Sequence, residues 1–208
     1  MLIERPPLLY RLFYPDAVFR APGEKKVAYL TFDDGPIPEA TPWVLDVLDS
    51  YRVKATFFMV GDNVRKYPHL YEEVIRRGHK VGNHTMHHLQ GLKVTTEEYL
   101  SDIAIAADYI KSRLFRPPHG FIGPGQAKRV AQDYRLVMYD LITRDYSRRL
   151  TSQEVFENVR RYTRNGSIIV FHDSIKSMPR LKDALPRSIE WLQSQGYELA
   201  TLDKLEKY

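Results

Sequence analysis

Two short segments combine residue types that bind divalent metal ions. Asp33 and Asp34 are adjacent, and His84, His87 and His88 lie within five residues. Imidazoles three or four residues apart fall on one face of a helical turn, so His84 can share a metal ion with either His87 or His88. Two histidines and one carboxylate leave coordination positions open for water, which is typical of a catalytic metal site.

Each of these motifs also has a simpler interpretation. Paired histidines often lie on protein surfaces and bind nothing. Gly35 and Pro36 directly follow the two aspartates, so the aspartates also suit a polar turn. The metal interpretation therefore depends on further groups that hydrolysis requires.

Hydrolysis at such a metal requires a base for water, a stabiliser for the oxyanion and an acid for the leaving group. One aspartate of the pair can be the base. His172 ends an apolar run and is a candidate acid, although such a histidine is more often structural. Arg116 can hold a carboxylate in bidentate geometry, and the proline-rich turn up to His119 can present a backbone amide to an oxyanion.

The elements that must position these residues alternate between strands and helices. Strands are expected at 27–32, 54–60, 79–82, 136–141, 167–171 and 197–200, and helices at 41–51, 70–77, 96–114, 125–133, 152–164 and 181–195. This alternation predicts a parallel sheet with outer helices, either open or closed into a barrel. Because the C-terminal ends of parallel strands share one face, the polar residues that follow the strands are predicted to converge.

Composition narrows the class of protein. The chain has 208 residues, of which 43% are hydrophobic and 27% charged, values typical of one globular domain. It has no cysteine, which excludes thiolate ligands and cysteine nucleophiles. Prolines and arginines interrupt the N-terminal leucines, so we expect no membrane span, no secretory signal and a cytoplasmic location for the chain as given; export of a longer precursor is the alternative. The net charge is +5, but the sequence has no nucleic-acid-binding motif, so we expect no nucleic-acid partner. We expect the chain to be a monomer.

Together the motifs resemble the polysaccharide deacetylase family, carbohydrate esterase family 4, which includes chitin and peptidoglycan deacetylases. Four segments carry the resemblance in family order: Thr-Phe-Asp-Asp-Gly-Pro at 31–36, Asn-His-Thr-Met-His-His at 83–88, Arg-Pro-Pro-His-Gly at 116–120 and Val-Phe-His at 170–172. The segment 139–146 occupies the place of the family's remaining motif, with Tyr146 for the usual Trp.

The resemblance implies a distorted (β/α) barrel, usually with seven strands. A single domain is expected over 1–208, with 1–25 as an N-terminal extension packed on a catalytic core of 26–208. A divalent metal is implied, most often zinc, with cobalt, nickel or iron as alternatives. The ligands it assigns are Asp34, His84 and His88, so that His87 falls outside the ligand set.

The same resemblance assigns the catalytic roles. Asp33 would be the general base, Arg116 would orient it, and His172 would be the general acid. The backbone amide of His119 would help to stabilise the oxyanion. The substrate contacts that we expect come from Tyr146, Val170, Phe32 and Asp145, with Val170 lining an apolar pocket for the acetyl methyl group.

One departure from the family pattern affects the acid. Ile142 stands where the family normally has the aspartate that tunes the catalytic histidine. Without that carboxylate we expect the pKa of His172 to be lower and the residue to be a weaker acid at neutral pH. Asp140 lies two residues earlier, on the same strand face, and is the expected substitute.

The predicted function is removal of acetyl groups from N-acetylated sugars in oligo- or polysaccharides that contain N-acetylglucosamine, with release of acetate. An O-acetyl ester or a non-sugar amide would suit the same machinery. A catalytically weakened, metal-retaining glycan-binding protein is a further alternative, motivated by the altered segment 139–146. The presence of Asp33, Arg116 and His172 argues against a binding protein.

Overall fold

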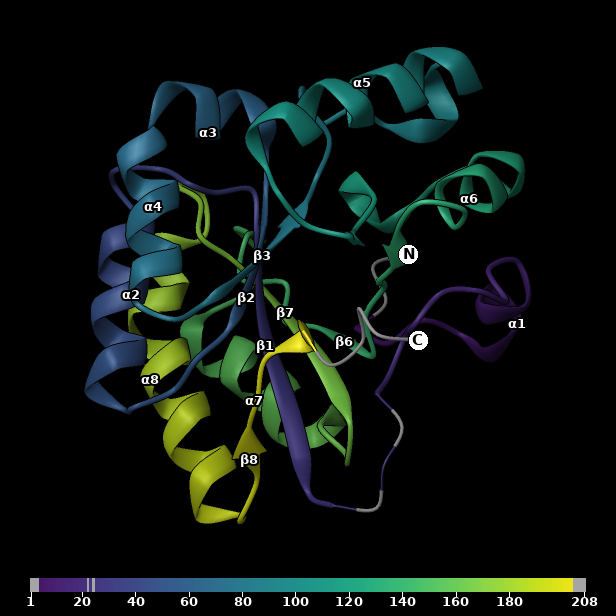
Figure 1. The fold of residues 1–208 in the computed structure, drawn as a ribbon. Helices are drawn as coiled ribbons and strands as arrows, with labels where there is room; N and C mark the ends of the chain where they lie inside the picture. The colour runs from purple at the N-terminus through teal and green to yellow at the C-terminus, as the bar shows by residue number, and fades with distance from the viewer. Residues whose placement is uncertain (1–3, 22, 24, 204–208) are drawn as a thin grey trace.

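A curled, wholly parallel sheet forms the centre of the molecule (Figure 1). The computed structural model describes residues 4–21, 23 and 25–203. Its strands are β1 (Val27–Asp33), β2 (Thr56–Met59), β3 (Lys80–Asn83), β4 (Leu114–Phe115), β5 (Arg135–Leu136), β6 (Leu141–Ile142), β7 (Ser167–His172) and β8 (Glu198–Leu199). In these described residues seven strands follow the order β5-β4-β3-β2-β1-β7-β6, and β8 pairs with the start of β1. The predicted distorted (β/α) barrel is confirmed.

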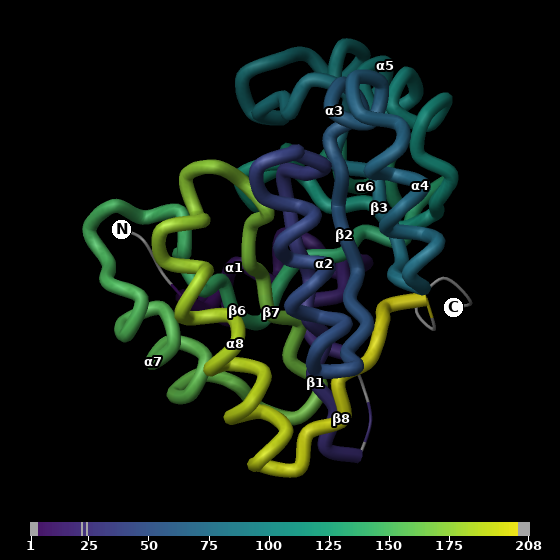
Figure 2. Tube along the Cα trace, turned by 90° about the vertical axis from the view of Figure 1, so that its left-hand side faces the viewer, coloured from purple at the N-terminus to yellow at the C-terminus, as the bar shows by residue number. Residues whose placement is uncertain are grey.

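Helices cover the outer side of this sheet. They are α1 (Leu8–Leu12), α2 (Thr41–Ser50), α3 (Gly61–Lys66), α4 (Pro68–Arg76), α5 (Thr96–Tyr109), α6 (Pro124–Val130), α7 (Ser152–Tyr162) and α8 (Met178–Ser194), with short 3₁₀ turns η1 (Gly91–Lys93) and η2 (Pro118–Gly120). Figure 2 shows α2 and α8 on the side turned towards the viewer. No helix in the described ranges is long and apolar enough to span a bilayer.

Side-chain alternation along the central strands separates the core from the barrel interior. Leu30 and Phe32 of β1 point towards the helices and are fully buried in the largest apolar cluster, with residues of α2 and α8. Thr31 and Asp33 therefore point to the opposite side, into the barrel. The same parity in β7 places Phe171 in the apolar cluster.

The strand expected at 136–141 is divided into two, β5 and β6, because the chain leaves the ladder between them. Val137 forms a parallel bridge with Val18, and the amide of Met138 donates to the carbonyl of Val18 at 2.8 Å. The sequence pattern did not predict β4 or α3. A two-residue strand such as β4 is too short to show a period in the sequence.

The N-terminal segment occupies the gap between β5 and β6. Besides the bridge from Val18, Arg20 forms an antiparallel bridge with Ser167, the first residue of β7. Tyr14 and Phe19 are buried in a second apolar cluster with residues of α5 and α6. The segment therefore completes the barrel wall that the short strands leave open.

Candidate active site

The C-terminal ends of the central strands meet around one cavity of about 400 Å³. In the ladder Asp33 of β1 stands opposite His172 of β7, and Asn83 ends β3 directly before His84. The predicted convergence of polar residues is thus present. The residues that line the cavity are Asp33, Asp34, His84, His88, Arg116, His119, Gly120, Phe121, Tyr139, Ile142, Tyr146, Val170, His172, Ser174 and Lys176.

One carboxylate and two imidazoles in this cavity form a cluster suited to a metal ion. The ligand atoms of Asp34, His84 and His88 all lie within 4.8 Å of one another. Nε2 of His88 is 3.1 Å and Nε2 of His84 is 3.8 Å from Oδ1 of Asp34. Of the two partners that spacing alone left open for His84, the structure brings His88 to the cluster. This donor set fits zinc and also cobalt, nickel or iron.

The ring of His84 is held in the form that a metal ligand requires. Its Nδ1 donates a hydrogen bond to the carbonyl of Arg116 at 2.7 Å. The unprotonated nitrogen is then Nε2, which faces Asp34 and has its lone pair available to a metal ion. Burial is the main cause that lowers the pKa of His84, to about 4, so the imidazole is neutral at pH 7. A neutral, oriented imidazole binds a cation without first losing a proton.

The histidine segment is a loop and not the helical turn assumed from the spacing. Thr85 and His88 have φ values of 65° and 55°, in the left-handed region. Asp102 of α5 holds the loop: its Oδ2 accepts the amides of Met86 at 2.8 Å and His87 at 3.0 Å. The other oxygen of Asp102 contacts Nδ1 of His87 at 2.5 Å. His87 thus pairs with Asp102, outside the cluster.

Asp33 is held by a buried arginine. Nη1 of Arg116 donates to Oδ1 of Asp33 at 2.6 Å and to Thr31 Oγ1 at 2.8 Å, while Nη2 donates to the carbonyl of Met138 at 3.0 Å. The guanidinium also lies 4.1 Å from the ring centroid of Phe58. The expected bidentate contact is therefore absent: a single N–H engages the carboxylate, Thr31 and Met138 accept from the other bonded donors, and Nε has no partner among the described residues.

The carboxylate partner of His172 is Asp145, which corrects two expectations. Nδ1 of His172 donates to Oδ1 of Asp145 at 2.8 Å, and the backbone amide of His172 donates to Oδ2 at 2.8 Å. Asp145 is fully buried, so it cannot contact a substrate as expected. Burial alone would lower the pKa of His172, but the charge and hydrogen bond of Asp145 raise it to about 9. The expectation of a lowered pKa was wrong.

Asp140 is not the carboxylate beside His172, contrary to expectation. It is fully buried beside arginines at the starts of β6 and β7, 3.0 Å from Arg11 and 2.6 Å from Arg164. Its Oδ2 also accepts from Ser167 Oγ at 2.8 Å. Asp145, which pairs with His172 instead, comes from the loop after β6. In this loop Arg144 adopts a left-handed φ of 63°. Strand periodicity carries no signal for such a loop.

The cavity walls differ in part from expectation. Tyr146 and Val170 line the cavity, and the Tyr146 ring lies 4.9 Å from that of His172. Phe32, expected to contact substrate, lies in the core with its ring 5.0 Å from Phe57, because it neighbours the inward-pointing Asp33 in the strand. The sequence pattern gave no signal for Tyr139, Phe121 and Lys176, which also line the cavity.

The proline-rich turn η2 brings His119 next to the cluster of Asp34, His84 and His88. His119 has a φ of 61°, and its ring lies 4.6 Å from that of His88. Its side chain lines the cavity, and burial lowers its pKa.

A further buried carboxylate lies behind the cavity. Oδ1 of Asp173 accepts the amide of Gly35 at 3.1 Å, and Oδ2 accepts the hydroxyl of Thr41 at 2.6 Å. Burial is the main cause that raises the pKa of Asp173, to about 8. Because Asp173 follows His172 and Gly35 follows Asp34, these bonds join the ends of β7 and β1 behind the site.

Several proteins that resemble this chain in sequence or structure are named as carbohydrate deacetylases. A model of the family described as "Polysaccharide deacetylase" matches residues 20–139. The chain is 32% identical to a peptidoglycan-N-acetylglucosamine deacetylase of Bacillus cereus, over 91% of this chain and 92% of that protein. It is also 32% identical to a chitooligosaccharide deacetylase of a Bradyrhizobium species, over 85% of this chain and 89% of that one. The crystal structure of the peptidoglycan N-acetylglucosamine deacetylase Bc1960 has a TM-score of 0.89 at 30% identity, with 97% of each chain covered.

Proposed function

Because the chain belongs to the polysaccharide deacetylase family, we propose that it removes acetyl groups from N-acetylglucosamine units of an oligo- or polysaccharide in a metal-dependent reaction. The observation that carries this proposal is one cavity that holds both the Asp34, His84 and His88 cluster and the two proton-transfer candidates Asp33 and His172. The relatives named for peptidoglycan and chitooligosaccharide suggest the class of glycan.

Asp33 is placed to accept a proton from the attacking water. When bound, a divalent metal would polarise the acetamide carbonyl and lower the pKa of water. Asp34, His84 and His88 would hold it. Asp33 keeps one oxygen on Arg116 and has the other available for a proton, because Oδ2 forms no hydrogen bond with any described residue.

His172 is placed to give a proton to the departing sugar amine. Its raised pKa keeps the imidazolium charged at neutral pH, and its Nδ1 is committed to Asp145. Nε2 is therefore the nitrogen available to the substrate. An acid that holds its proton at pH 7 suits an amine leaving group, which departs only after protonation.

The remaining walls can orient the acetamide. Val170, Ile142 and Tyr146 form an apolar surface beside His172 on which the acetyl methyl group can rest. We assign the backbone amide of His119 to the oxyanion, where it would share the developing charge with the metal.

The decisive experiment measures acetate release from chitooligosaccharides, peptidoglycan fragments and acetylated xylan. The protein is first treated with a chelator and then given zinc or cobalt. We expect no release after chelation and metal-restored release from an N-acetylated glycan. Release from acetylated xylan alone would reassign the protein to ester hydrolysis. No release from any substrate, despite one bound metal ion, would contradict the proposal.

A further inference from the structure

The N-terminal helix α1 exposes apolar side chains that nothing in the described chain covers. Leu8, Leu9, Leu12 and Phe13 are 80%, 67%, 75% and 56% exposed, and α1 has no buried residue. Single exposed leucines are ordinary, but four large apolar side chains within six residues form a patch of the kind that marks an interaction surface. We call these four residues the α1 patch.

The α1 patch is held in place against the body of the protein. The hydroxyl of Tyr10 donates to the carbonyl of Gly120, and that of Tyr14 donates to the carbonyl of Ile122 at 2.6 Å. The ring of Tyr10 also lies 5.4 Å from that of Phe121. Phe121 is 52% exposed and lines the active-site cavity. The patch is thus a fixed surface next to one wall of that cavity.

Positive charge exceeds negative charge around α1. Arg5, Arg11 and Arg164 share the single carboxylate of Asp140, at 3.8, 3.0 and 2.6 Å. All three arginines keep between a quarter and two fifths of their side-chain surface exposed. These three arginines and one carboxylate therefore carry a net positive charge beside α1.

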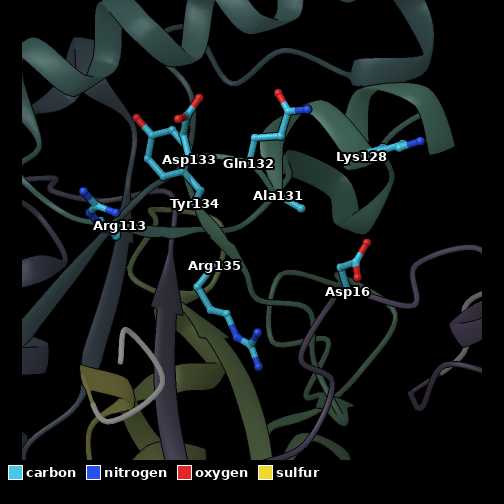
Figure 3. Close-up of a pocket in the computed structure, with 8 residues that line it drawn as sticks. All are labelled: Asp16, Arg113, Lys128, Ala131, Gln132, Asp133, Tyr134 and Arg135. Carbon is cyan, nitrogen blue, oxygen red and sulfur yellow. The ribbon is translucent and has the colours of Figure 1, made fainter. Parts of the chain in front are cut away.

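A second excess of cations lies beyond α1, in the surface cavity of Figure 3. Arg113, Lys128 and Arg135 line it and form no ion pair with any described residue. Asp16 and Asp133 line it as well, so the cations outnumber the carboxylates. Lys128 and Asp16 also line a neighbouring cavity together with Phe13, which makes this surface continuous with the α1 patch.

We propose that the α1 patch docks on an anionic lipid surface. Leucine and phenylalanine side chains would enter the boundary between headgroups and acyl chains, and the surrounding cations would face the anionic headgroups. A second copy of this chain fits less well as the occupant. A five-residue helix offers little of the area that a stable dimer buries, and the cations around it would repel their copies across a symmetric contact.

The test is co-sedimentation of the full chain with vesicles of phosphatidylglycerol or phosphatidylcholine. We expect binding to phosphatidylglycerol vesicles that weakens as salt is added, and at least tenfold weaker partitioning to phosphatidylcholine. The double variant Leu9→Ser/Leu12→Ser should lower partitioning to phosphatidylglycerol by at least tenfold. A matched control is Ile75→Ser, on α4, which lies across the molecule from α1 in Figure 1 and is 46% exposed. It should bind vesicles like the parent chain.

Three outcomes would overturn the proposal. One is a parent chain that does not sediment with phosphatidylglycerol vesicles. Another is a double variant that binds vesicles as tightly as the parent, with circular dichroism showing both chains folded. The third is self-association that Leu9→Ser/Leu12→Ser abolishes without vesicle binding, which would assign the α1 patch to a second copy. None of these outcomes depends on turnover, so failure here is distinct from failure of the proposed deacetylation.

Discussion

Asp145 binds His172 through both of its oxygens, one to the ring and one to the backbone. The Nδ1–Oδ1 and N–Oδ2 distances are both 2.8 Å, and Asp145 is fully buried. One carboxylate therefore fixes the position of the strand end and the rotation of the ring together. It also supplies the main charge that raises the pKa of His172.

This pair predicts the upper limit of the pH profile. His172 acts as an acid only while protonated, so activity should hold below its pKa of about 9 and fall as the pH rises through that value. In Asp145→Asn the main charge that raises the pKa of His172 is gone, and burial favours the neutral ring. We expect the pH at which kcat falls on the alkaline side of the profile to decrease by about one unit or more.

The control for that experiment is Asp140→Asn, since Asp140 is also buried but pairs with Arg11 and Arg164. It should leave the pH of this alkaline fall in place and lower the midpoint of thermal unfolding, because arginines lose their shared partner. If the alkaline fall in kcat stayed at the same pH in Asp145→Asn but shifted in Asp140→Asn, Asp140 and not Asp145 would be the residue that sets the pKa of His172.

Replacement of the proposed base should separate binding from chemistry. Asp33→Asn keeps the shape of the side chain, so the protein should retain its metal while turnover falls by about 100-fold or more. Asp133→Asn, which removes a carboxylate from the cavity of Figure 3, should retain full turnover. Acetate release and glycan affinity are measured together. Undiminished release from Asp33→Asn would require a different base, and glycan affinity without turnover in the parent chain would favour a binding protein.

The histidine loop predicts a clear difference between neighbouring residues. His84→Ala and His88→Ala should each abolish stoichiometric binding of zinc, because each removes one of three clustered ligands. His87→Ala should keep about one zinc per chain, since His87 pairs with Asp102 instead. Metal content after dialysis, measured by mass spectrometry, checks this. Loss of zinc from His87→Ala with retention by His88→Ala would show that the ligand set is wrong.

Gly35 is required by the close approach of Asp173. A Cβ at position 35 would lie 2.0 Å from Oδ2 of Asp173, which is buried and hydrogen-bonded to Thr41. Gly35→Ala should lower the free energy of unfolding by about 1–3 kcal/mol. It should also weaken zinc binding, because the proposed ligand Asp34 is the preceding residue.

The matched control for Gly35→Ala is Gly125→Ala. No atom lies within 4 Å of a Cβ built at Gly125, which sits in α6, and alanine favours a helix. It should leave stability unchanged or raise it slightly. Chemical unfolding and zinc titration of both variants make the comparison. If Gly35→Ala were as stable and bound zinc as tightly as the parent, Asp173 would have room to move and the packing argument would fail.

Strand ends could be read from the sequence, and with them much of the site. Asp33 and His172 end apolar runs that are long enough to identify as strands, so their approach to each other follows from parallel topology. The proximity of Asp34, His84 and His88 agrees with the ligand set that the family resemblance implied. Their roles in binding and catalysis stay predictions.

What the sequence could not reveal lies in side-chain parity and in loops. The motif at 31–36 predicted a substrate contact for Phe32, whereas alternation with Asp33 puts this residue in the core. Asp145 reaches His172 from a loop with a left-handed residue at Arg144, and no periodic pattern describes such a path. Asp140 was chosen by strand parity, but the strand is interrupted there and its arginine partners come from α1 and from the chain before β7.

The N-terminal segment that fills the gap between β5 and β6 also has a consequence for how the chain folds. Its contacts span most of the sequence: Tyr14 bonds to a residue 108 positions away and Arg11 to one 129 positions away. During synthesis this segment leaves the ribosome before its partners around β5, β6 and β7, which are made much later. Tyr14 and Phe19 of the segment must therefore stay exposed until nearly all of these partners exist. A segment made before the rest of the barrel is thus among the last to dock, and closing the barrel wall is a late event in folding.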